Sequence, residues 1–304
     1  MPRDDRLFRD RVTHKLPPHL SGWQLPPDWA WGADGVEGEH RHYQELVDGL
    51  GRSLSLVSAP DPDHATWLFN EARRLAHLNH PSIPTTYHFW SRYPESPRGP
   101  GYLRRWIPGE TIWAQLERTG PFDLSNTLQF LRNIGSAVAY MHTAGTVHGA
   151  LSAETCWTTP TGRLWLLGWE WAIPRAEIPE GLTPARRWMP IPPEWPKDEW
   201  TPTPASDQWQ LAATAFAALT GEYPPRDIPP LRLVRPDLPR RVPLYSRGRE
   251  IRIVVGDRDA ASSVGSYMSA VGQFLAAIAM AAVSMEATGS RDELPSIVLA
   301  GIEE

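Results

Sequence analysis

The stretch VHGALSAET, residues 147–155, decides how this chain is interpreted. It follows residues 123–145, where apolar side chains recur at helical spacing and Gly145 can end the helix. It precedes residues 162–172, GRLWLLGWEWA, which are typical of a buried strand after a Thr-Gly turn. Residues 147–155 are therefore predicted to form a loop between a long helix and a strand.

Apolar residues are patterned differently along the chain. Residues 21–60 alternate short apolar runs with Gly-containing turns, which favours strands joined by hairpins. Residues 63–80 have the spacing of a helix that stops at Pro81. Later segments are mostly helical, and the nearly continuous apolar character of 206–221 predicts a central helix. The sequence therefore predicts an α+β fold with a small β-rich part and a larger helical part.

The composition argues against several classes of protein. The chain has 304 residues and a formal net charge of −5, which offers no general attraction to nucleic acid or to an anionic membrane. Its one cysteine, Cys156, speaks against a disulfide framework and a cysteine-rich metal site. The N-terminal residues are too charged for a secretory signal peptide, and the apolar run 274–285 is shorter than the roughly 20 residues of a membrane span. We therefore expect a cytoplasmic protein that binds neither nucleic acid nor membrane.

Six segments carry short motifs in a fixed order: FNEARRLAHLNHPSIP (69–84), GYLRRWIPGETI (101–112), VAYMHTAGTVHGALSAET (138–155), GRLWLLGWEWA (162–172), PPE (192–194) and SDQWQLAATAFAALTGEYPP (206–225). In this order they resemble the ion-pair helix, the hinge strand, the catalytic loop, the D-F-G segment, the A-P-E motif and the central helix of eukaryotic-like Ser/Thr protein kinases of the bacterial type. Ala150 and Gly168 are 18 positions apart, and Glu194 and Asp207 are 13 apart, as the family spaces these motifs. One match is weak, but six in order make the resemblance specific.

The resemblance implies a two-lobed protein-kinase-like fold. Residues 21–104 would form a small β-rich lobe and residues 105–245 a larger helical lobe, after a polar lead-in over residues 1–20. Residues 246–304 depart from the family, because strand-like segments there enclose a helix rich in small residues. We expect this last segment either to replace the final helices of the large lobe or to form a small α/β appendage.

The residue types that phosphoryl transfer requires are absent from the matching positions. Kinases hold the phosphates of ATP with a Lys, carry Mg²⁺ on an Asp and an Asn, and use another Asp to accept the proton of the substrate hydroxyl. The family also has a second Lys close to the base. On the resemblance, the residues at these kinase positions are Val57 for the phosphate-binding Lys, Ala150 for the base, Ser152 for the second Lys, Thr155 for the metal-binding Asn and Gly168 for the Asp of D-F-G. We therefore predict a pseudokinase: no enzyme, no catalytic residues and no cofactor.

Three glycines stand where the family has its phosphate-covering loop. Gly32, Gly35 and Gly38 are spaced three residues apart, not in a G-x-G-x-x-G pattern, and acidic residues lie among them. Negative side chains beside an anionic ligand disfavour its binding. We therefore interpret this stretch as a hairpin turn that does not bind a nucleotide.

Several other matching positions are expected to have structural roles. Glu71 occupies the ion-pair position on the small-lobe helix, but its Lys partner is absent. An Arg could take that place, and we expect Glu71 to face water instead. Leu75, His148 and Trp169 match positions that stack into an apolar column between the lobes, so we expect His148 to be a satisfied core residue.

The remaining acidic positions have one expected role each. Asp207 would anchor the catalytic-loop backbone by accepting N–H bonds. Glu194 would need an Arg from the end of the large lobe, for which Arg258 is a candidate. Glu154 and Glu170 are the alternative metal ligands, although single loop carboxylates are usually solvated. We therefore predict no metal site.

The expected function is a regulatory or scaffolding binding module in signalling, with another protein as its partner. The small residues of 260–284 would also allow self-association through the C-terminal segment. One alternative is an atypical ATP-dependent phosphoryl or nucleotidyl transferase with displaced catalytic groups, which alone would require ATP and Mg²⁺. The other is a structural partner that binds through the Trp/Pro-rich loop 188–204 or through the C-terminal segment.

Overall fold

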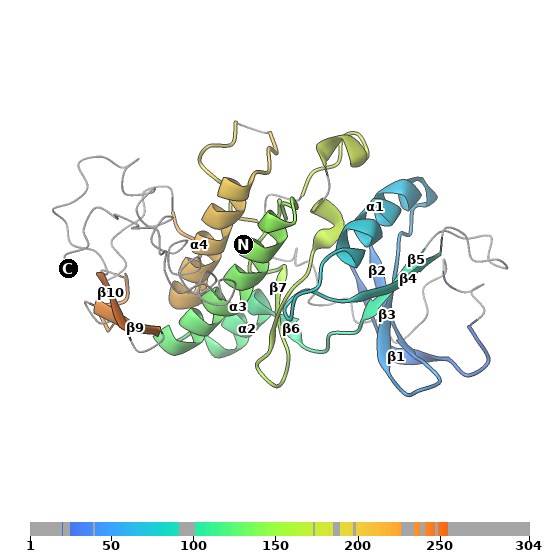
Figure 1. Cartoon of the computed structure of the whole chain (residues 1–304), viewed down its shortest axis with the longest axis horizontal. Coiled ribbons are helices and arrows are strands. Elements are labelled where there is room, and N and C mark those ends of the chain that lie inside the picture. Colours follow the sequence, from blue (N-terminus) through green and yellow to red (C-terminus); the bar gives the residue numbers. More distant parts are fainter. Residues whose placement is uncertain are drawn as a thin grey trace.

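The computed structural model describes residues 20, 25–38, 40–90, 101–172, 174–184, 189–196, 199–225, 234–237, 241–246 and 249–254. Within these ranges the chain forms two lobes, which lie side by side in Figure 1. One lobe is a sheet covered by a single helix, and the other is built mainly of helices. The boundary between them is where the loop 147–155 and its neighbours meet the small-lobe helix.

A five-stranded antiparallel sheet forms the small lobe, in the order β1-β2-β3-β5-β4. Alternate residues of its third strand face opposite sides, so Leu54 and Leu56 pack in one apolar cluster and Val57 in another. The cluster of Val57 is the one that faces the helix of this lobe. The strands are β1 (Ala30–Glu37), β2 (His42–Val47), β3 (Ser53–Ser58), β4 (Thr86–Trp90) and β5 (Gly101–Arg105).

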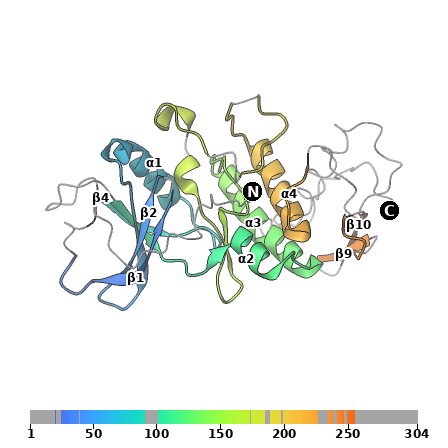
Figure 2. The ribbon, with the colours of Figure 1, turned by 180° about the vertical axis from the view of Figure 1, so that it is seen from behind.

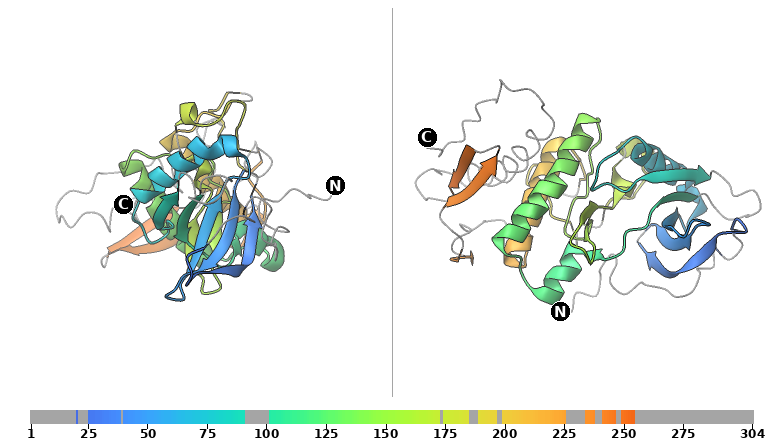
Figure 3. Two further views of the ribbon diagram at one scale, coloured as in Figure 1. Left: turned by 90° about the vertical axis from the view of Figure 1, so that its right-hand side faces the viewer. Right: turned by 60° about the horizontal axis from the view of Figure 1, so that its bottom comes forward.

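The helix α1 (Ala65–Ala76) lies across one side of this sheet (Figure 3). Its buried residues Leu68, Ala72 and Leu75 recur every three or four positions, so the helix turns one apolar stripe towards the strands. A short 3-10 helix, η2 (Pro62–His64), leads into it. The helix that the sequence predicts within 63–80 is therefore present and covers the sheet.

Three helices build the large lobe: α2 (Ile112–Thr119), α3 (Leu124–Thr143) and α4 (Pro204–Thr220). The helices α3 and α4 pack against each other along their lengths (Figure 2). Asp123 begins α3 by accepting a hydrogen bond from the backbone N of Asn126 at 2.7 Å. Thr203 and Ser206 form a reciprocal capping box at the start of α4. Both α3 and α4 therefore begin at a residue whose side chain caps the helix N-terminus.

A three-stranded sheet lies between the five-stranded sheet and the helices, with the order β6-β7-β8. Its strands are β6 (Glu110–Thr111), β7 (Cys156–Thr158) and β8 (Leu164–Leu166). The loop 147–155 joins α3 to β7, so the predicted helix–loop–strand order is observed. Two 3-10 helices, η3 (Trp169–Trp171) and η4 (Arg175–Glu177), follow β8 and bring the chain back towards α1.

The last described elements form a hairpin of β9 (Arg241–Ser246) and β10 (Arg249–Val254). This hairpin lies beyond the helices, at the opposite end from the small lobe (Figures 1 and 2). The strand predicted at 249–256 is therefore present, and the hairpin spans the boundary predicted after residue 245. The helix predicted at 260–286 and the last predicted strand lie outside the described residues.

The α+β, two-lobed, kinase-like fold that the sequence predicts is confirmed for the described part of the chain. In the same ranges, no helix has the length and apolar character to cross a membrane. The apolar run 274–285 lies outside them.

Gly109, in the connection between β5 and β6, provides a test of this packing. Its φ is 131°, and an added Cβ would lie 1.9 Å from the carbonyl O of Thr158 on β7. We expect Gly109→Ala to destabilise the protein much more than Gly145→Ala, which has a φ of 70° and open space around it. The control should cost about 1–2 kcal/mol, the usual penalty of a left-handed backbone. Urea unfolding measures both, and equal losses would contradict this packing.

Candidate functional site

The loop 147–155 is held from behind by a buried carboxylate on α4. Asp207 accepts hydrogen bonds from the backbone N of His148 and of Gly149, each at 2.8 Å and each on a different oxygen. His142 Nε2 lies 2.9 Å from the same carboxylate. Two N–H donors on one fully buried carboxylate fix the path of the loop at its start.

The polar side chains later in this loop bond to the loop itself. The Thr155 hydroxyl donates to the carbonyl O of Ala150 at 3.2 Å, and the backbone N of Ser152 donates to Thr155 Oγ1 at 2.9 Å. A Cβ on Gly168 would lie 2.5 Å from Thr155 Cγ2, and the φ of Gly168 is 80°. A carboxylate at position 168 therefore does not fit this arrangement, and Ser152 and Thr155 serve to close the loop.

His148 lies inside the protein, between the lobes. Its Nε2 bonds to the carbonyl O of Leu167 at 2.8 Å, and its ring stands edge-on to Trp169 with 5.3 Å between centroids. Burial lowers the pKa of His148, which favours the neutral ring. Leu75 and Trp169 belong to one buried apolar cluster, which includes residues of both lobes. The structure thus places all three residues at the junction.

Glu71 does not face water, and the expectation that it would is wrong. Its Oε2 accepts a bond from Arg41 Nε at 2.7 Å, and its Oε1 accepts one from the Tyr102 hydroxyl at 2.7 Å. The Arg41 guanidinium also lies 4.1 Å from the ring centroid of Trp67. Val57, where the family has its Lys, is fully buried in the apolar cluster beneath α1. The cation therefore comes from the residue before β2 and not from β3.

A sequence signal for Arg41 existed. Within residues 21–60 only Arg41 and Arg52 are Lys or Arg, and Arg41 directly follows the glycine-containing turn. Arg52 pairs with Asp48 at the surface in the β2–β3 turn. The sequence therefore offered Arg41, next to the predicted strand that became β2, as a candidate partner of Glu71.

Comparison with known proteins agrees with this geometry, although no model of a protein family matches the chain. The chain is 28% identical over 189 residues to the serine/threonine-protein kinase PknA of Mycobacterium tuberculosis and of Mycobacterium bovis, an alignment that covers 59% of this chain. It is 27% identical over 139 residues to a probable serine/threonine-protein kinase of Streptomyces coelicolor. The chain is related to the bacterial Ser/Thr protein kinases. It spans 44% of the length of PknA and 20% of that of the Streptomyces protein.

The relationship corrects one prediction. The chain was predicted not to be an enzyme, and the relatives that it matches are named as Ser/Thr protein kinases, which contradicts that prediction. The prediction rested on residue types at single matching positions, and it assumed that each chemical group must come from its usual place. The Arg41–Glu71 pair shows that this assumption fails in at least one case, because the cation is supplied by the residue that precedes β2.

The glycines of the kinase-type phosphate loop lie in a hairpin. Gly32 and Gly35 are within β1, and Gly35 is paired with Gln44 of β2. Gly38 begins the turn, where its N donates to the carbonyl O of Arg41 at 2.7 Å. A Cβ on Gly32 would lie 2.5 Å from Glu45 Cγ. These glycines therefore permit close approach within the hairpin.

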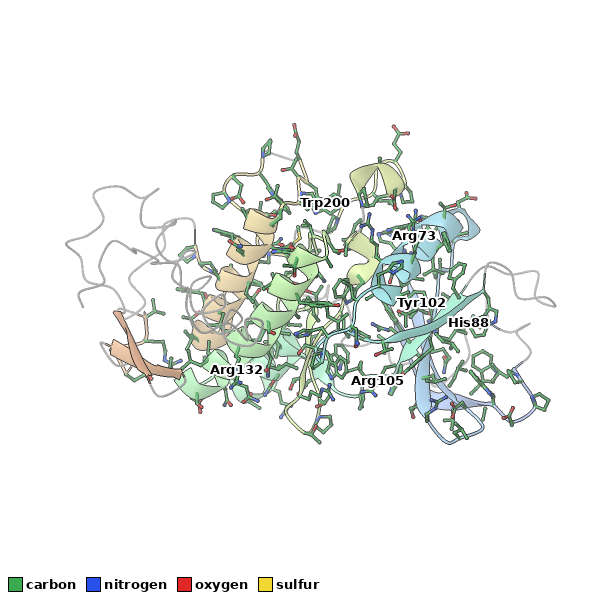
Figure 4. The ribbon with its side chains drawn as sticks, in the orientation of Figure 1. Arg73, His88, Tyr102, Arg105, Arg132 and Trp200 are labelled. Atoms are coloured by element: carbon green, nitrogen blue, oxygen red, sulfur yellow. The ribbon has the colours of Figure 1, made fainter. Side chains whose placement is uncertain are left out.

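Tryptophan side chains cover the position of the kinase base. Ala150 is fully buried in a cluster with Trp67, Trp171 and Trp200. Trp200 Nε1 donates to the carbonyl O of Gly149 at 2.8 Å, and the Trp171 and Trp200 rings stand 5.9 Å apart. Figure 4 shows Trp200 above the helical lobe, on the side of the molecule that also carries α1. This part of the junction is therefore filled by the chain's own indoles.

The two acidic candidates for metal binding are both buried side chains. Glu170 is buried, and the charged groups that act on its pKa are Glu71, Arg41 and Arg104. Glu154 is also buried. Across the described ranges, no group of three or more His, Cys, Asp or Glu side chains could hold a metal ion.

The Trp/Pro-rich loop 188–204 turns its described tryptophans inward. Trp195 and Trp200 are each 6% exposed, so their rings are unavailable as docking anchors. Glu194 is exposed, and Arg258, its expected partner, lies outside the described residues. These two tryptophans therefore belong to the buried cluster around Ala150.

Replacing Arg41 tests the ion pair. We expect Arg41→Met to destabilise the protein by about 3–5 kcal/mol, because it leaves the Glu71 carboxylate buried without its cation. The matched control is Arg52→Met, whose guanidinium pairs with Asp48 but is 62% exposed, and exposed pairs are worth about 0–1 kcal/mol. Urea unfolding of both variants measures the difference. Similar losses would show that Glu71 does not depend on Arg41.

Glu170 predicts a pH dependence of stability. Burial, and then the charge of Glu71, raise the pKa of Glu170 from 4.5 to about 7, while Arg41 and Arg104 act in the opposite direction. Between these two pKa values the folded state binds more protons than the unfolded state, so the free energy of unfolding falls as the pH rises through that window. We expect Glu170→Gln to remove this fall, and the exposed Glu222→Gln to keep it. Parallel unfolding curves for all three proteins against pH would contradict the assignment.

Proposed function

We propose that this chain is a regulatory binding domain of bacterial-type Ser/Thr protein-kinase signalling, which presents a protein-kinase-like fold to another protein. The observation that carries the proposal is the double attachment of α1. On one side Glu71 is bonded to Arg41 beside β2 and to Tyr102 of β5. On the other side the Trp67 indole donates to the carbonyl O of Glu170 in η3. The helix that joins the lobes is thereby fixed to both.

A fixed α1 suits a domain that works by binding. Surfaces that are held in one arrangement lose less conformational freedom when a partner binds, so more of the contact energy appears as affinity. The side chains at the kinase positions face inward: Val57 lies under α1, and Ala150 lies under the tryptophans. The outer surface of the two lobes is therefore what the domain offers to a partner, and we expect that partner to be a protein.

The test compares partner binding by two conservative variants. Proteins cross-linked to the chain in its own cells would be purified and titrated against it without nucleotide. The proposal expects at least one signalling protein to bind saturably and Trp67→Phe to weaken that binding, because Phe keeps the ring but loses the bond to Glu170. Trp113→Phe is the control, since its indole bonds only to Glu117 on the exposed side of α2. If no recovered protein binds saturably, or if both variants bind as the parent does, the proposal fails.

A second candidate function is ATP-dependent phosphoryl transfer with displaced groups. Two observations favour it: the relatives are named as kinases, and Arg41, just before β2, supplies the cation that pairs with Glu71. Thermal unfolding with ATP or ADP, each with and without Mg²⁺ or Mn²⁺, tests it. A ligand at 100 times its dissociation constant stabilises by about 2.7 kcal/mol, which is an easily measured shift. Metal-dependent stabilisation would support this candidate, and no shift under any condition would reject it.

A further inference from the structure

Four charged side chains from separate parts of the chain meet at the junction of the lobes. Arg41 precedes β2, Glu71 is on α1, Arg104 is on β5, and Glu170 is in η3. All four are buried, with at most 7% of any of them exposed. Three belong to the small lobe, and Glu170 is the contribution of the large lobe. A change in the charge of Glu170 therefore alters the electrostatic interaction between the two lobes.

The hydrogen bonds of this cluster are unevenly shared. Both oxygens of Glu71 have donors, in Arg41 and Tyr102. Among the residues that the structure describes, none forms a hydrogen bond with Glu170 Oε2, Arg41 Nη2 or Arg104 Nε. A buried polar atom without a partner costs free energy, and the cost rises when the group is charged. Glu170 is thus the carboxyl group of the cluster that is least satisfied when it is ionised.

Burial shifts the pKa values of several other titratable side chains around Glu170 away from neutral pH. Burial raises the pKa of Tyr43 and of Tyr102 further above their ordinary value, so both phenols stay protonated. Burial lowers the pKa of His40 to about 4 and lowers that of His64, and both rings lie around Trp67. Burial likewise lowers the pKa of His148, beside Trp169. In contrast, the pKa of Glu170 is moved towards neutral pH, to about 7.

The backbone of Glu170 is itself a point of attachment between the lobes. Its carbonyl O accepts the bond from the Trp67 indole, and the ring of the next residue, Trp171, lies 5.1 Å from that of Trp67. An ionised Glu170 gains free energy if water reaches it, and η3, which carries Glu170, packs against α1, so separation of η3 from α1 would expose the side chain to water. Hydration of this side chain and release of Trp67 are therefore coupled.

We propose that Glu170 makes the lobe junction a proton-operated latch, in which the protonated carboxyl keeps α1 and η3 together and its ionisation favours their separation. The inference rests on the attachment of α1 that the proposed function also uses. It adds a signal, the proton, which controls how firmly that attachment holds.

The distance between the lobes tests the latch directly. Cysteines introduced as Leu50→Cys in the β2–β3 turn and Ser125→Cys on α3 occupy exposed positions in different lobes, and the native Cys156 is buried. Spin labels on this pair, in the full chain, would report the distance at about pH 5.5 and about pH 8.5, on either side of the titration. We expect longer and broader distances at the higher pH. With Glu170→Gln in the same background, we expect the low-pH distances at both.

Two further variants keep the test decisive. Glu222→Gln, at the end of α4, removes an exposed carboxylate and should respond to pH as the parent does. Arg104→Met removes a charge that favours ionised Glu170, so it should move the opening to higher pH. A parent whose distances do not change with pH, or a Glu170→Gln variant that opens as the parent does, would overturn the latch. The distances need no partner, so they can fail while partner binding holds, and the reverse.

Discussion

The structure depends on the burial of one ion pair, between Arg41 and Glu71. A carboxylate on the inner face of α1 cannot remain buried without a cation and further donors. Arg41 and the Tyr102 hydroxyl meet that requirement, and in doing so they bind α1 to β2 and β5. The guanidinium in turn lies against Trp67, which reaches Glu170 in the other lobe. The need to pair the buried carboxylate of Glu71 thus fixes the position of α1, which contacts both lobes.

The large lobe meets this arrangement with its own buried carboxylate. Asp207 holds the loop 147–155 through two backbone N–H groups, and Trp200 covers the same loop from the other side. The relatives that this chain matches are named as Ser/Thr protein kinases, and the chain shares their two-lobed kind of fold. In this chain the scaffold is filled with aromatic side chains at the place where the kinase base would lie. The same tryptophan cluster therefore fills the junction and holds the two lobes together.

Much of the fold was predictable from the sequence, because it follows from local rules. The hairpins, the helix before Pro81 and the order of motifs around VHGALSAET all lie in contiguous segments with clear periodicity. The partner of Glu71 was missed, because it lies 30 positions away and just before β2, whereas the resemblance places the cation on β3. The inward direction of Trp195 and Trp200 was also not readable, since a Trp among prolines looks the same whether it anchors a partner or a core. Side-chain contacts between residues far apart in the chain could therefore not be predicted from the sequence.

The most direct test of the central claim, that α1 is fixed to both lobes, is hydrogen exchange of the Trp67 indole N–H. Measured by NMR at about pH 6, where the junction is closed, this proton should exchange as slowly as the backbone amides of the buried residues of α3, because it is released only when the lobes part. The indole of Trp113, bonded to Glu117 on an exposed face, provides a fast reference in the same spectrum. Slow exchange at Trp67 is the predicted result. Exchange at the rate of Trp113 would contradict the account.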